Sequence, residues 1–436
     1  MNNIAIPRRT EAGFTPRRGV EVRSLLAFAV LAVAWISFSP FDVASLSDTE
    51  SASDGKLINQ IGYTAVSAAA VLALLTMTGR EVASRMLSLG WIAMFVLLVI
   101  SGYTAADPDD AVRSTLFTII ATVMAATAFA LPNNARALSA ALATACAAVL
   151  ILSYAGVLIY PEAAIHTAEG VEANHSGLWR GIFTHKNTAG PVMAAIAFSG
   201  IYLTRRGWRL PGAIIALAAI VFVWNTGSKT STALVPAIIV LVMVPSLVGM
   251  RFLAASAIIF SVVSIYALTI GTVFVPSFDA ILRGFNETTT FTGRIEIWEF
   301  ARDFVTRHPW TGFGYDSFWG EAVTENAEQA FDSTWDPRGI VHGHSGFLDV
   351  TLFMGLPALF LSVWLLLLAP LWQYLRTPPF RENVLLADLC LMIVSFMIMN
   401  SAMESYFFRR ADPIWLTLVA ALFGLRLCSR FKLRSE

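Results

Sequence analysis

The sequence predicts an all-α polytopic membrane protein of about twelve transmembrane helices, and two observations support this prediction. First, 56% of the 436 residues are hydrophobic and only 14% are charged, whereas soluble domains carry about 25% charged residues. Second, several long runs are almost free of charge, for example 139–160 and 211–227. A run of roughly 20 apolar residues can cross the hydrocarbon core as a helix. The alternating pattern of membrane β-strands is absent from the sequence, so the spans are predicted to be helices.

The apolar runs give the positions of the expected spans. Their approximate limits are 24–40, 57–79, 86–103, 111–131, 136–160, 188–204, 211–226, 231–248, 252–274, 345–368, 384–402 and 412–428. The chain is therefore expected to consist of a cytoplasmic N-terminal tail (1–23), nine spans with short loops (24–274), a large outer loop (275–344), three further spans (345–428) and a cytoplasmic tail (429–436).

The distribution of charge indicates how these spans are oriented. With the N-terminus in the cytoplasm and the spans alternating, cytoplasmic segments contain 18 of the 30 Lys and Arg residues, whereas the short outer loops contain seven. This bias follows the positive-inside rule, so both termini are expected in the cytoplasm. The formal net charge is zero, and no nucleic-acid partner is expected. Cys146, Cys390 and Cys428 lie in or beside apolar runs without disulfide or zinc spacing, so we interpret them as core residues.

Polar residues of possible chemical importance are collected on the outer side. Two outer segments, 161–187 and 275–344, contain all six histidines, namely His166, His175, His185, His308, His342 and His344. The second segment is far longer than an ordinary connection between helices. We therefore expect the functional residues on this face of the membrane.

The stretch WRGIFTHKNTAG (179–190) ends the first outer segment. Arg180, His185 and Lys186 stand just before the sixth span, and Asn187 or the following threonine is expected to cap the N-terminus of its helix. A helix N-terminus beside Arg and Lys forms an anion site that suits phosphate. These four residues are therefore candidates for binding a phosphorylated substrate.

The stretch WNTGSKTSTALV (224–235) forms a second polar turn on the outer side. Its backbone N–H groups, with Ser228 and the ammonium of Lys229, can meet an anion. The alternative is an ordinary loop lysine that extends its charge to the membrane surface.

The stretch TGRIEIWEFARDFVTRHPWTGFGYDSF (292–318) predicts an amphipathic helix in the large loop. Apolar residues recur at helical spacing from about 293, and His308-Pro309 ends the pattern. The helix is expected along the membrane surface or over the bundle. Arg294 falls in its first turn, where a cation opposes the helix dipole. This position favours a role in holding an anion, and the alternative is a surface arginine.

The stretch VHGHSGFLDVTLFMGLPALF (341–360) begins the tenth span. His344 is expected near the outer interface at a helix start, where it can act as a general base near neutral pH. The alternative is a capping histidine. His342 and His344 lack a clear third ligand, so no metal site and no cofactor are expected. Glu404 is a further candidate near a span end, with pairing to Arg409 as the alternative.

Aromatic residues accompany these charges in the large loop. Trp298, Trp310 and Tyr315 are candidates for stacking on sugar rings, although anchoring at the membrane interface explains the tryptophans about as well. Arg409 joins the cations expected on the same face. Together, the cations and one interfacial histidine suit a lipid-linked pyrophosphate and a nucleophilic hydroxyl.

Several of these segments together resemble the O-antigen ligase/Wzy-type polymerase family of bacterial envelope proteins. The segments are RGIFTHKNTAG, TGSKTST, TGRIEIWEFARDFVTRHPWTGFGYDSF and HSGFLDVTLFMGLP. Each is short, but their order and spacing over roughly 175–405 make the combination specific. The Arg-Gly-x-Phe-x-His-Lys-Asn form and the Ser-Lys-Thr turn look most like the exopolysaccharide polymerase branch.

The resemblance implies a GT-C-like fold in the bacterial inner membrane, with a large periplasmic loop and a periplasmic active site. The implied substrate is an undecaprenyl-diphosphate-linked oligosaccharide, and a chain-length regulator or export complex is the implied protein partner. The family's His-Ser/Asn pattern, followed by Gly, matches His344, Ser345 and Gly355. Its periplasmic arginines match Arg180 and Arg294 best, with Lys186 as an alternative to the first.

We therefore hypothesise a metal-independent, inverting glycosyltransferase that polymerises lipid-linked repeats into exopolysaccharide. Arg180, Lys186 and Arg294 bind the diphosphate in this hypothesis, and His344 accepts the proton of the attacking hydroxyl. The first alternative is a ligase that transfers the glycan to lipid A core or another acceptor. The second is a transporter of the same lipid-linked sugar, which predicts mid-membrane charges and an internal repeat.

Overall fold

The computed structural model describes residues 17–41, 57–167, 175–285, 291, 293–320, 322–325, 336, 338 and 340–435, and within these ranges every regular element is a helix. The elements are α1 (Arg17–Ile36), α2 (Leu57–Met77), α3 (Arg80–Met86), α4 (Leu89–Tyr103), α5 (Pro108–Thr127), α6 (Ala135–Ile159), α7 (Pro161–Ala164), α8 (Lys186–Arg206), α9 (Arg209–Asn225), α10 (Lys229–Leu247), α11 (Arg251–Leu268), α12 (Gly271–Phe274), α13 (Pro276–Phe285), α14 (Arg294–Arg307), α15 (Ala322–Glu325), α16 (Gly346–Val363), the π-helical turn η2 (Trp364–Leu368), α17 (Ala369–Leu375), α18 (Arg381–Asn400) and α19 (Pro413–Arg430).

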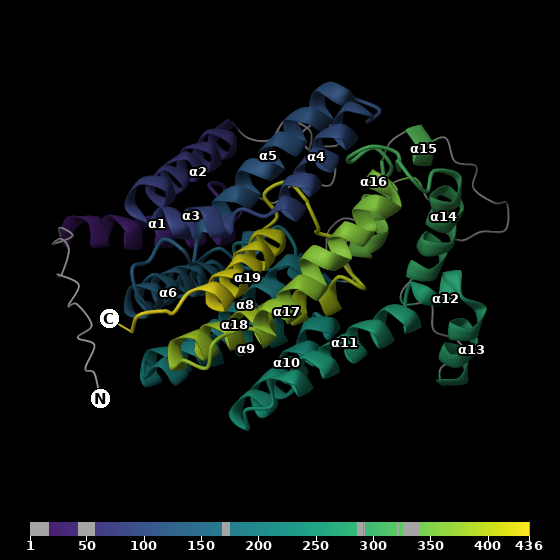
Figure 1. Cartoon of the computed structure of the whole chain (residues 1–436). Helices are drawn as coiled ribbons and strands as arrows, with labels where there is room; N and C mark the ends of the chain where they lie inside the picture. The colour runs from purple at the N-terminus through teal and green to yellow at the C-terminus, as the bar shows by residue number, and fades with distance from the viewer. Residues whose placement is uncertain are drawn as a thin grey trace, which may run out of the picture.

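The long helices form one bundle, and the short helices α12 to α15 gather at one end of it (Figure 1). Helix α18 lies at the centre, where it packs against α8, α10 and α19. Every residue of α18 from Leu385 to Asn400 is buried. Helices α8 and α18 each contain about 20 residues, so each is about 30 Å long, which matches the hydrocarbon thickness of a bilayer.

Each of the twelve expected spans coincides with a helix, but fewer helices are long and apolar enough to cross a membrane by themselves. Within the described part of the chain, seven pass this test, or up to eight if the bent pair α3 and α4 is one span. Helix α5 carries Asp109, Asp110 and Arg113, and α9 is only 17 residues long. Over the described residues the structure therefore confirms an all-helical chain with several helices long and apolar enough to span a membrane, while the number twelve and the GT-C-like arrangement stay predictions.

Helices α8 and α9 pack unusually closely because glycines face each other at their crossing. A Cβ atom on Gly200 would lie 2.5 Å from the backbone nitrogen of Ala216, and one on Gly212 would lie 2.5 Å from that of Thr204. Small residues allow such close backbone approach between membrane helices. The crossing fixes α9 against α8, whose N-terminus reaches the candidate site described below.

Helix α16 is broken at Gly355, which has non-helical backbone angles (φ 75°, ψ −176°). Pro357 lacks an N–H group, so the carbonyl of Phe353 is free to accept bonds from Ser101 Oγ (2.9 Å) and the Gly314 nitrogen (3.1 Å). The Phe313 nitrogen likewise donates to Leu352 O at 2.7 Å. The break therefore joins α16 to the turn that follows α14, and it lies where Gly355 and Pro357 interrupt the helix.

The amphipathic helix of the large loop forms where the sequence predicts it. Helix α14 begins after Gly293, which has a positive φ of 81°, and ends at His308. Ile297, Trp298 and Ala301 are its buried residues, and its apolar face packs against α16. Arg294 is therefore held at the N-terminus of a helix that covers the start of α16.

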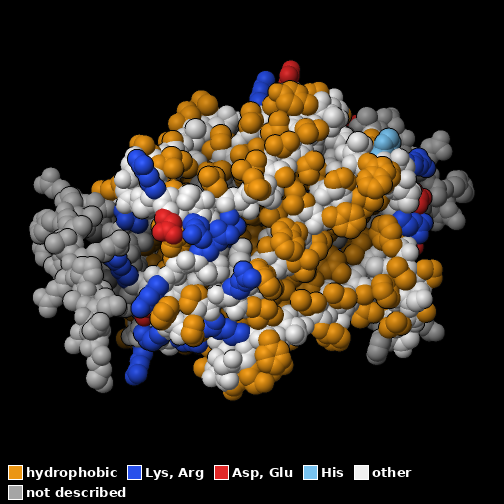
Figure 2. Space-filling model, viewed as in Figure 1, with side chains coloured by type: hydrophobic (Ala, Val, Ile, Leu, Met, Phe, Trp, Pro, Cys, Tyr) orange, Lys and Arg blue, Asp and Glu red, His pale blue; other side chains and the backbone are white. Residues whose placement is uncertain are grey.

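Most of the arginines collect at the opposite end of the bundle. Arg381 donates to the carbonyl of Arg205 (2.9 Å), and Arg426 donates to that of Arg85 (2.8 Å), so these segments share one end. Figure 2 shows Lys and Arg side chains gathered toward this end, beside a broad hydrophobic surface. We call it the arginine-rich end and its opposite the His344 end. Their separation agrees with the bias of basic residues in the sequence.

Two buried ion pairs close the arginine-rich end of α8 and α18. Arg205 lies 2.7 Å from Asp388, and Arg206 lies 2.5 Å from Glu382. Asp388 also accepts hydrogen bonds from Ser246 Oγ at 2.6 Å and Tyr374 Oη at 3.0 Å. The three cysteines are buried and free, as expected for core residues.

Candidate functional site

Four side chains from four separate segments meet at the His344 end. Glu404 Oε1 accepts hydrogen bonds from Arg294 Nη2 and Asn187 Nδ2, each at 3.0 Å. Glu404 Oε2 lies 3.8 Å from His344 Nδ1, and Arg294 Nη2 lies 3.4 Å from the same ring nitrogen. The structure thus brings three residues predicted from sequence, Arg294, His344 and Asn187, around one carboxylate. We call these four residues the Glu404 cluster.

The backbone before α16 determines where His344 points. The Gly343 nitrogen donates to Asp349 Oδ1 (3.0 Å), and the Gly343 carbonyl accepts from Trp298 Nε1 (2.9 Å). His344 itself has a positive φ of 49°, which is uncommon for a residue with a side chain. Such strain persists where neighbouring contacts hold it in place. Helices α14 and α16 together therefore fix the imidazole of His344 toward Arg294 and Glu404.

The Glu404 cluster is neither fully buried nor freely exposed. The side chains of Arg294, Glu404 and His344 are 17%, 16% and 28% exposed. An ion pair in this position is screened less than one on the surface, yet a substrate can still reach it. The ring of His342 lies 4.1 Å from that of His344, and burial followed by the charges of His344 and Arg409 lowers the pKa of His342.

The N-terminus of α8 is capped by imidazoles, which differs from the expectation for Asn187 or Thr188. The Asn187 nitrogen donates to His185 Nδ1 at 3.0 Å, and the Lys186 nitrogen donates to His166 Nε2 at 3.1 Å. These histidines must be neutral to accept. Burial is the largest cause that lowers the pKa of His185 to about 3 and that of His166 to about 4. The helix amides expected to bind phosphate are therefore already occupied.

Arg180 lies in the wall of the site rather than in the Glu404 cluster. It is 6% exposed, and its guanidinium donates to the carbonyls of Ala163 (3.0 Å) and Glu162 (3.1 Å). Its charge also lowers the pKa of His166 and His185. Lys186, half-buried in the first turn of α8, lies on the same side and acts on both histidines in the same way.

The polar turn before α10 lies beside the first turn of α8. Ser228 caps α10 through a bond from the Ser231 nitrogen (3.4 Å), and a Cβ atom on Gly190 would lie 2.7 Å from Ser231 Oγ. Lys229 is exposed at this point. The structure therefore places Ser228 and Lys229 near the start of α8, and gives Ser228 a capping role.

Glu404 does not pair with Arg409, which was the alternative considered from sequence. Its hydrogen bonds go to Arg294 and Asn187, whereas Arg409 Nη2 donates to the carbonyl of Val341 at 3.1 Å. Arg409 therefore holds the loop that leads to His344 and leaves part of its charge available beside the cluster.

The three aromatic candidates occupy different environments. Trp298 is fully buried, and its indole donates to Gly343, so it supports the loop and presents no face to a sugar. Tyr315 is also buried, and its hydroxyl donates to the carbonyl of Phe408 at 2.8 Å. Trp310 is 69% exposed. Of the three, only Trp310 keeps an indole face that a sugar can approach.

A cavity of about 560 Å³ lies beside the loop that leads to His344, lined by Val341 of that loop. Its walls include Trp319, Val341, Arg409 and Arg410, together with the carboxylates of Asp107, Asp110, Asp316 and Asp412. The carbonyl of Val341 binds Arg409, so the cavity reaches the loop that carries His344. Mixed aromatic, cationic and acidic groups of this kind suit a polyhydroxylated ligand.

The structure supplies a third potential metal ligand that the sequence did not suggest. One ligand atom from each of His342, His344 and Glu404 lies within 4.8 Å of the others. However, Glu404 already accepts a bond from Arg294. A fixed guanidinium at this distance repels a divalent cation, so the donor set favours an anion or a neutral hydroxyl over a metal ion.

The sequence indicates Glu404 as a candidate without its partners, and it does not single out Asp349. Glu404 lies 217 residues from Asn187 and 110 from Arg294, so no local pattern joins them. An ionisable residue at the end of a span was the available signal, and it marked Glu404 without identifying its partners. Asp349 lies near the start of α16, where it orders the Gly343 backbone.

One comparison with known proteins supports the family suggested by the motifs. Residues 212–363 match the model of the O-antigen ligase family (Wzy_C). This segment contains Lys229, Arg294 and His344, but neither Arg180 nor Glu404. No curated protein matches the chain. The match supports a membrane enzyme of the ligase or polymerase type, and it confirms that the chain resembles the O-antigen ligase/Wzy-type family.

Proposed function

We propose that the protein is a glycosyltransferase that uses a lipid-diphosphate-linked oligosaccharide as donor and extends it into exopolysaccharide at the periplasmic face of the bacterial inner membrane. The observation that carries this proposal is the Glu404 cluster, in which a histidine and an arginine share one half-buried carboxylate. The family match to O-antigen ligase adds to it. The donor is activated by its phosphoanhydride, so the reaction needs no nucleotide.

Arg294 binds the diphosphate of the donor in this proposal. Its guanidinium lies at the N-terminus of α14, so the helix dipole adds to its attraction for an anion. Arg409 acts on neighbouring His342, and Lys186 and Lys229 lie in the first turns of α8 and α10, so we expect these cations to raise the positive charge on this side of the site. Arg180 keeps the 161–164 turn and the histidine cap of α8 in place. These cations stabilise the negative charge that develops on the leaving diphosphate.

His344 acts as the general base. Arg294 Nη2 donates toward His344 Nδ1 at 3.4 Å, so the base requires the other tautomer. When the diphosphate engages the Arg294 guanidinium, the imidazole proton lies on Nδ1 toward Glu404 Oε2, 3.8 Å away, and Nε2 faces the acceptor hydroxyl. The hydroxyl oxygen forms a bond to the anomeric carbon while the bond from that carbon to the diphosphate oxygen breaks. The hydroxyl proton passes to His344 Nε2, and lipid diphosphate leaves. Attack from the face opposite the leaving group inverts the anomeric configuration.

The acceptor sugar occupies the cavity beside Arg409, where acidic and aromatic side chains can bind its hydroxyl groups. In a polymerase this acceptor is a second lipid-linked chain, and in a ligase it is lipid A core or another glycan acceptor. The Ser228–Lys229 turn favours the polymerase because it resembles that branch of the family. We expect no metal in this step, because the Arg294 guanidinium beside the carboxylate repels a divalent cation.

Reconstitution tests the proposal. Purified protein in liposomes is given an oligosaccharide linked to undecaprenyl diphosphate, with and without a chelator, and the products are separated by gel. A ladder of longer lipid-linked glycans that is unaffected by the chelator supports the polymerase. A single transfer that requires added lipid A core identifies a ligase instead. Movement of intact donor across the bilayer without product contradicts both and identifies a transporter.

A further inference from the structure

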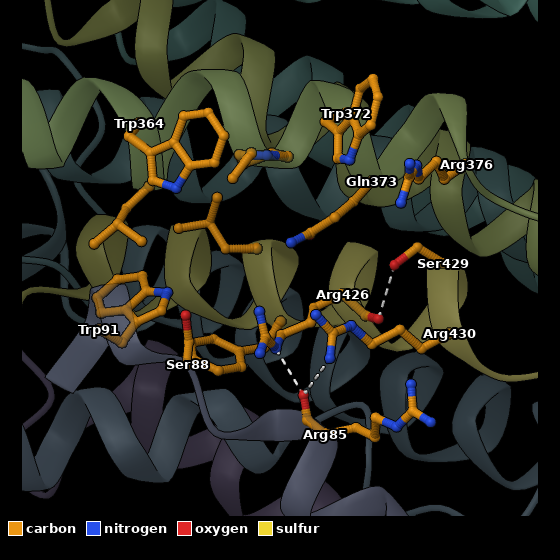
Figure 3. Close-up of a pocket in the computed structure, with 15 residues that line it drawn as sticks. Arg85, Ser88, Trp91, Trp364, Trp372, Gln373, Arg376, Arg426, Ser429 and Arg430 are labelled. Carbon is orange, nitrogen blue, oxygen red and sulfur yellow. Dashed lines mark hydrogen bonds between the residues drawn. The ribbon is translucent and has the colours of Figure 1, made fainter.

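A groove at the arginine-rich end lies far from the Glu404 cluster and has no part in the proposed reaction. It has a volume of about 520 Å³ and opens between α3, α17 and α19 (Figure 3). Arg85, Arg376, Arg426 and Arg430 line it, together with Trp364 and Trp372. Figure 3 shows Gln373 extending from α17 into the groove, with Arg376 beside Trp372 on the same side and Arg426, Ser429 and Arg430 on the opposite side.

The positive charge in this groove is not neutralised by its walls. Arg426 Nε and Arg430 Nη1 both donate to the carbonyl of Arg85, at 2.8 Å and 3.2 Å. Arg376 lies over the ring of Trp372, 4.2 Å from its centroid. Carbonyls and an aromatic ring orient these guanidinium groups but supply no net negative charge. Among the described lining residues there is no carboxylate, and Glu81, which pairs with Arg85 at 3.5 Å, is exposed outside the groove.

An apolar cavity of about 530 Å³ adjoins the groove and shares Ser88, Trp91 and Phe423 with it. Its walls are almost entirely hydrocarbon, including Leu74, Ile92, Phe95 and Val123. A ligand that carries only an anionic group would occupy the groove and leave this apolar cavity unfilled. A phospholipid has both parts, because its phosphate and its acyl chains are joined within one molecule.

We propose that the groove binds an anionic phospholipid of the surrounding bilayer. Its phosphate lies among the four arginines, and one acyl chain lies in the apolar cavity beyond Trp91. Basic pockets between membrane helices recognise anionic headgroups in this way, and tryptophans such as Trp364 and Trp372 are typical of the depth at which headgroups lie. The bound lipid connects α3, α17 and α19 and stabilises their packing.

The test compares lipids that differ only in headgroup charge. The protein is reconstituted in nanodiscs of equal phosphatidylcholine and phosphatidylglycerol, released, and analysed by native mass spectrometry for retained lipid. Wild type is expected to retain phosphatidylglycerol preferentially. The double variant Arg376→Gln/Arg430→Gln removes two exposed arginines. Each basic residue near the surface contributes about 1 kcal/mol of attraction to an anionic lipid, so the preference should fall by roughly thirtyfold. Arg209→Gln, exposed at the same end but outside the groove, is the matched control.

The outcomes separate a lipid from a soluble anion. Wild-type and Arg209→Gln proteins should retain the lipid equally, and soluble glycerophosphoglycerol, the same headgroup without its chains, should fail to displace it. Equal retention by the double variant and wild type would overturn the proposal. Displacement by the deacylated headgroup would overturn it as well, because the groove would then bind a soluble phosphate ester.

Discussion

The two ends of the α8–α18 pair hold ion pairs of different kinds. At the arginine-rich end, Asp388 is fully buried, and its oxygens bond to Arg205, Ser246 and Tyr374. At the His344 end, Glu404 is partly exposed. It forms an ion pair with Arg294, and its Oε2 lies 3.8 Å from His344 Nδ1. Both oxygens of Asp388 already accept hydrogen bonds, so the ion pair at the arginine-rich end holds helices together and leaves no acceptor for a ligand. The Glu404 cluster leaves an imidazole nitrogen and a guanidinium edge accessible, as a reactive site requires.

The comparison predicts the largest functional effect at the His344 end. Arg294→Ala should lower glycan transfer by 10²- to 10³-fold, the usual cost of removing one donor that stabilises developing negative charge. The thermal unfolding midpoint should fall as well, because the side chain is only 17% exposed and its removal leaves Glu404 without this partner, so transfer is compared per folded molecule. Transfer rate and unfolding are measured on the same preparation. Arg307→Ala, exposed at the other end of α14, should retain the wild-type rate; equal losses in both variants would contradict a specific role for Arg294.

The same comparison predicts a stability effect at the arginine-rich end. Asp388→Ala removes the partner of a largely buried guanidinium, and breaking such a pair costs about 3 kcal/mol of unfolding free energy. Transfer activity per folded molecule should be nearly unchanged. The control is Glu81→Ala, which breaks an exposed pair and should leave the unfolding midpoint close to that of wild type. An Asp388 variant that folds normally but is inactive would reverse the assignment of the two ends.

A smaller effect is predicted for pH, through the imidazole cap of α8. The pKa of His185 is about 3 and that of His166 about 4 in the folded protein, against 6.5 for the free side chain. The unfolded chain therefore binds more protons between these values, so the cap stabilises the fold fully above about pH 6.5 and less as pH falls toward 4.

The thermal unfolding midpoint measured between pH 7.5 and 5 tests this prediction. It should decline with pH in wild type. His185→Asn keeps a side chain that can cap α8 but does not titrate, so its midpoint should decline less. Identical pH dependence in the two proteins would show that the α8 cap does not titrate with folding.

Sequence patterns were sufficient for the helices and for individual charged residues. Helix α14 and the break at Gly355 follow from local periodicity and from Gly and Pro chemistry, which act within a few residues. The pairing of Arg294 with Glu404 cannot be predicted from local patterns, because it depends on how α14 and the segment after α18 pack in three dimensions. The capping of α8 by His166 could not be predicted for the same reason, because His166 lies 20 residues from Lys186 in the sequence.

Arg180 and Trp298 illustrate a related limit. Each has the residue type expected of a binding site, and each lies beside one, but their polar groups bond to backbone carbonyls. Residue type alone cannot distinguish a group that contacts a ligand from one that supports the loop carrying such a group. Burial decides between them, and burial is a property of the folded chain.

The most direct test of the central assignment separates donor binding from turnover in His344→Ala. Both are measured in nanodiscs, with donor affinity obtained from binding of the lipid-diphosphate oligosaccharide and kcat from glycan transfer. If His344 is the general base, donor Kd should stay within about threefold of wild type while kcat falls at least 100-fold. A variant that binds donor normally and turns over at a rate within threefold of wild type would contradict the account.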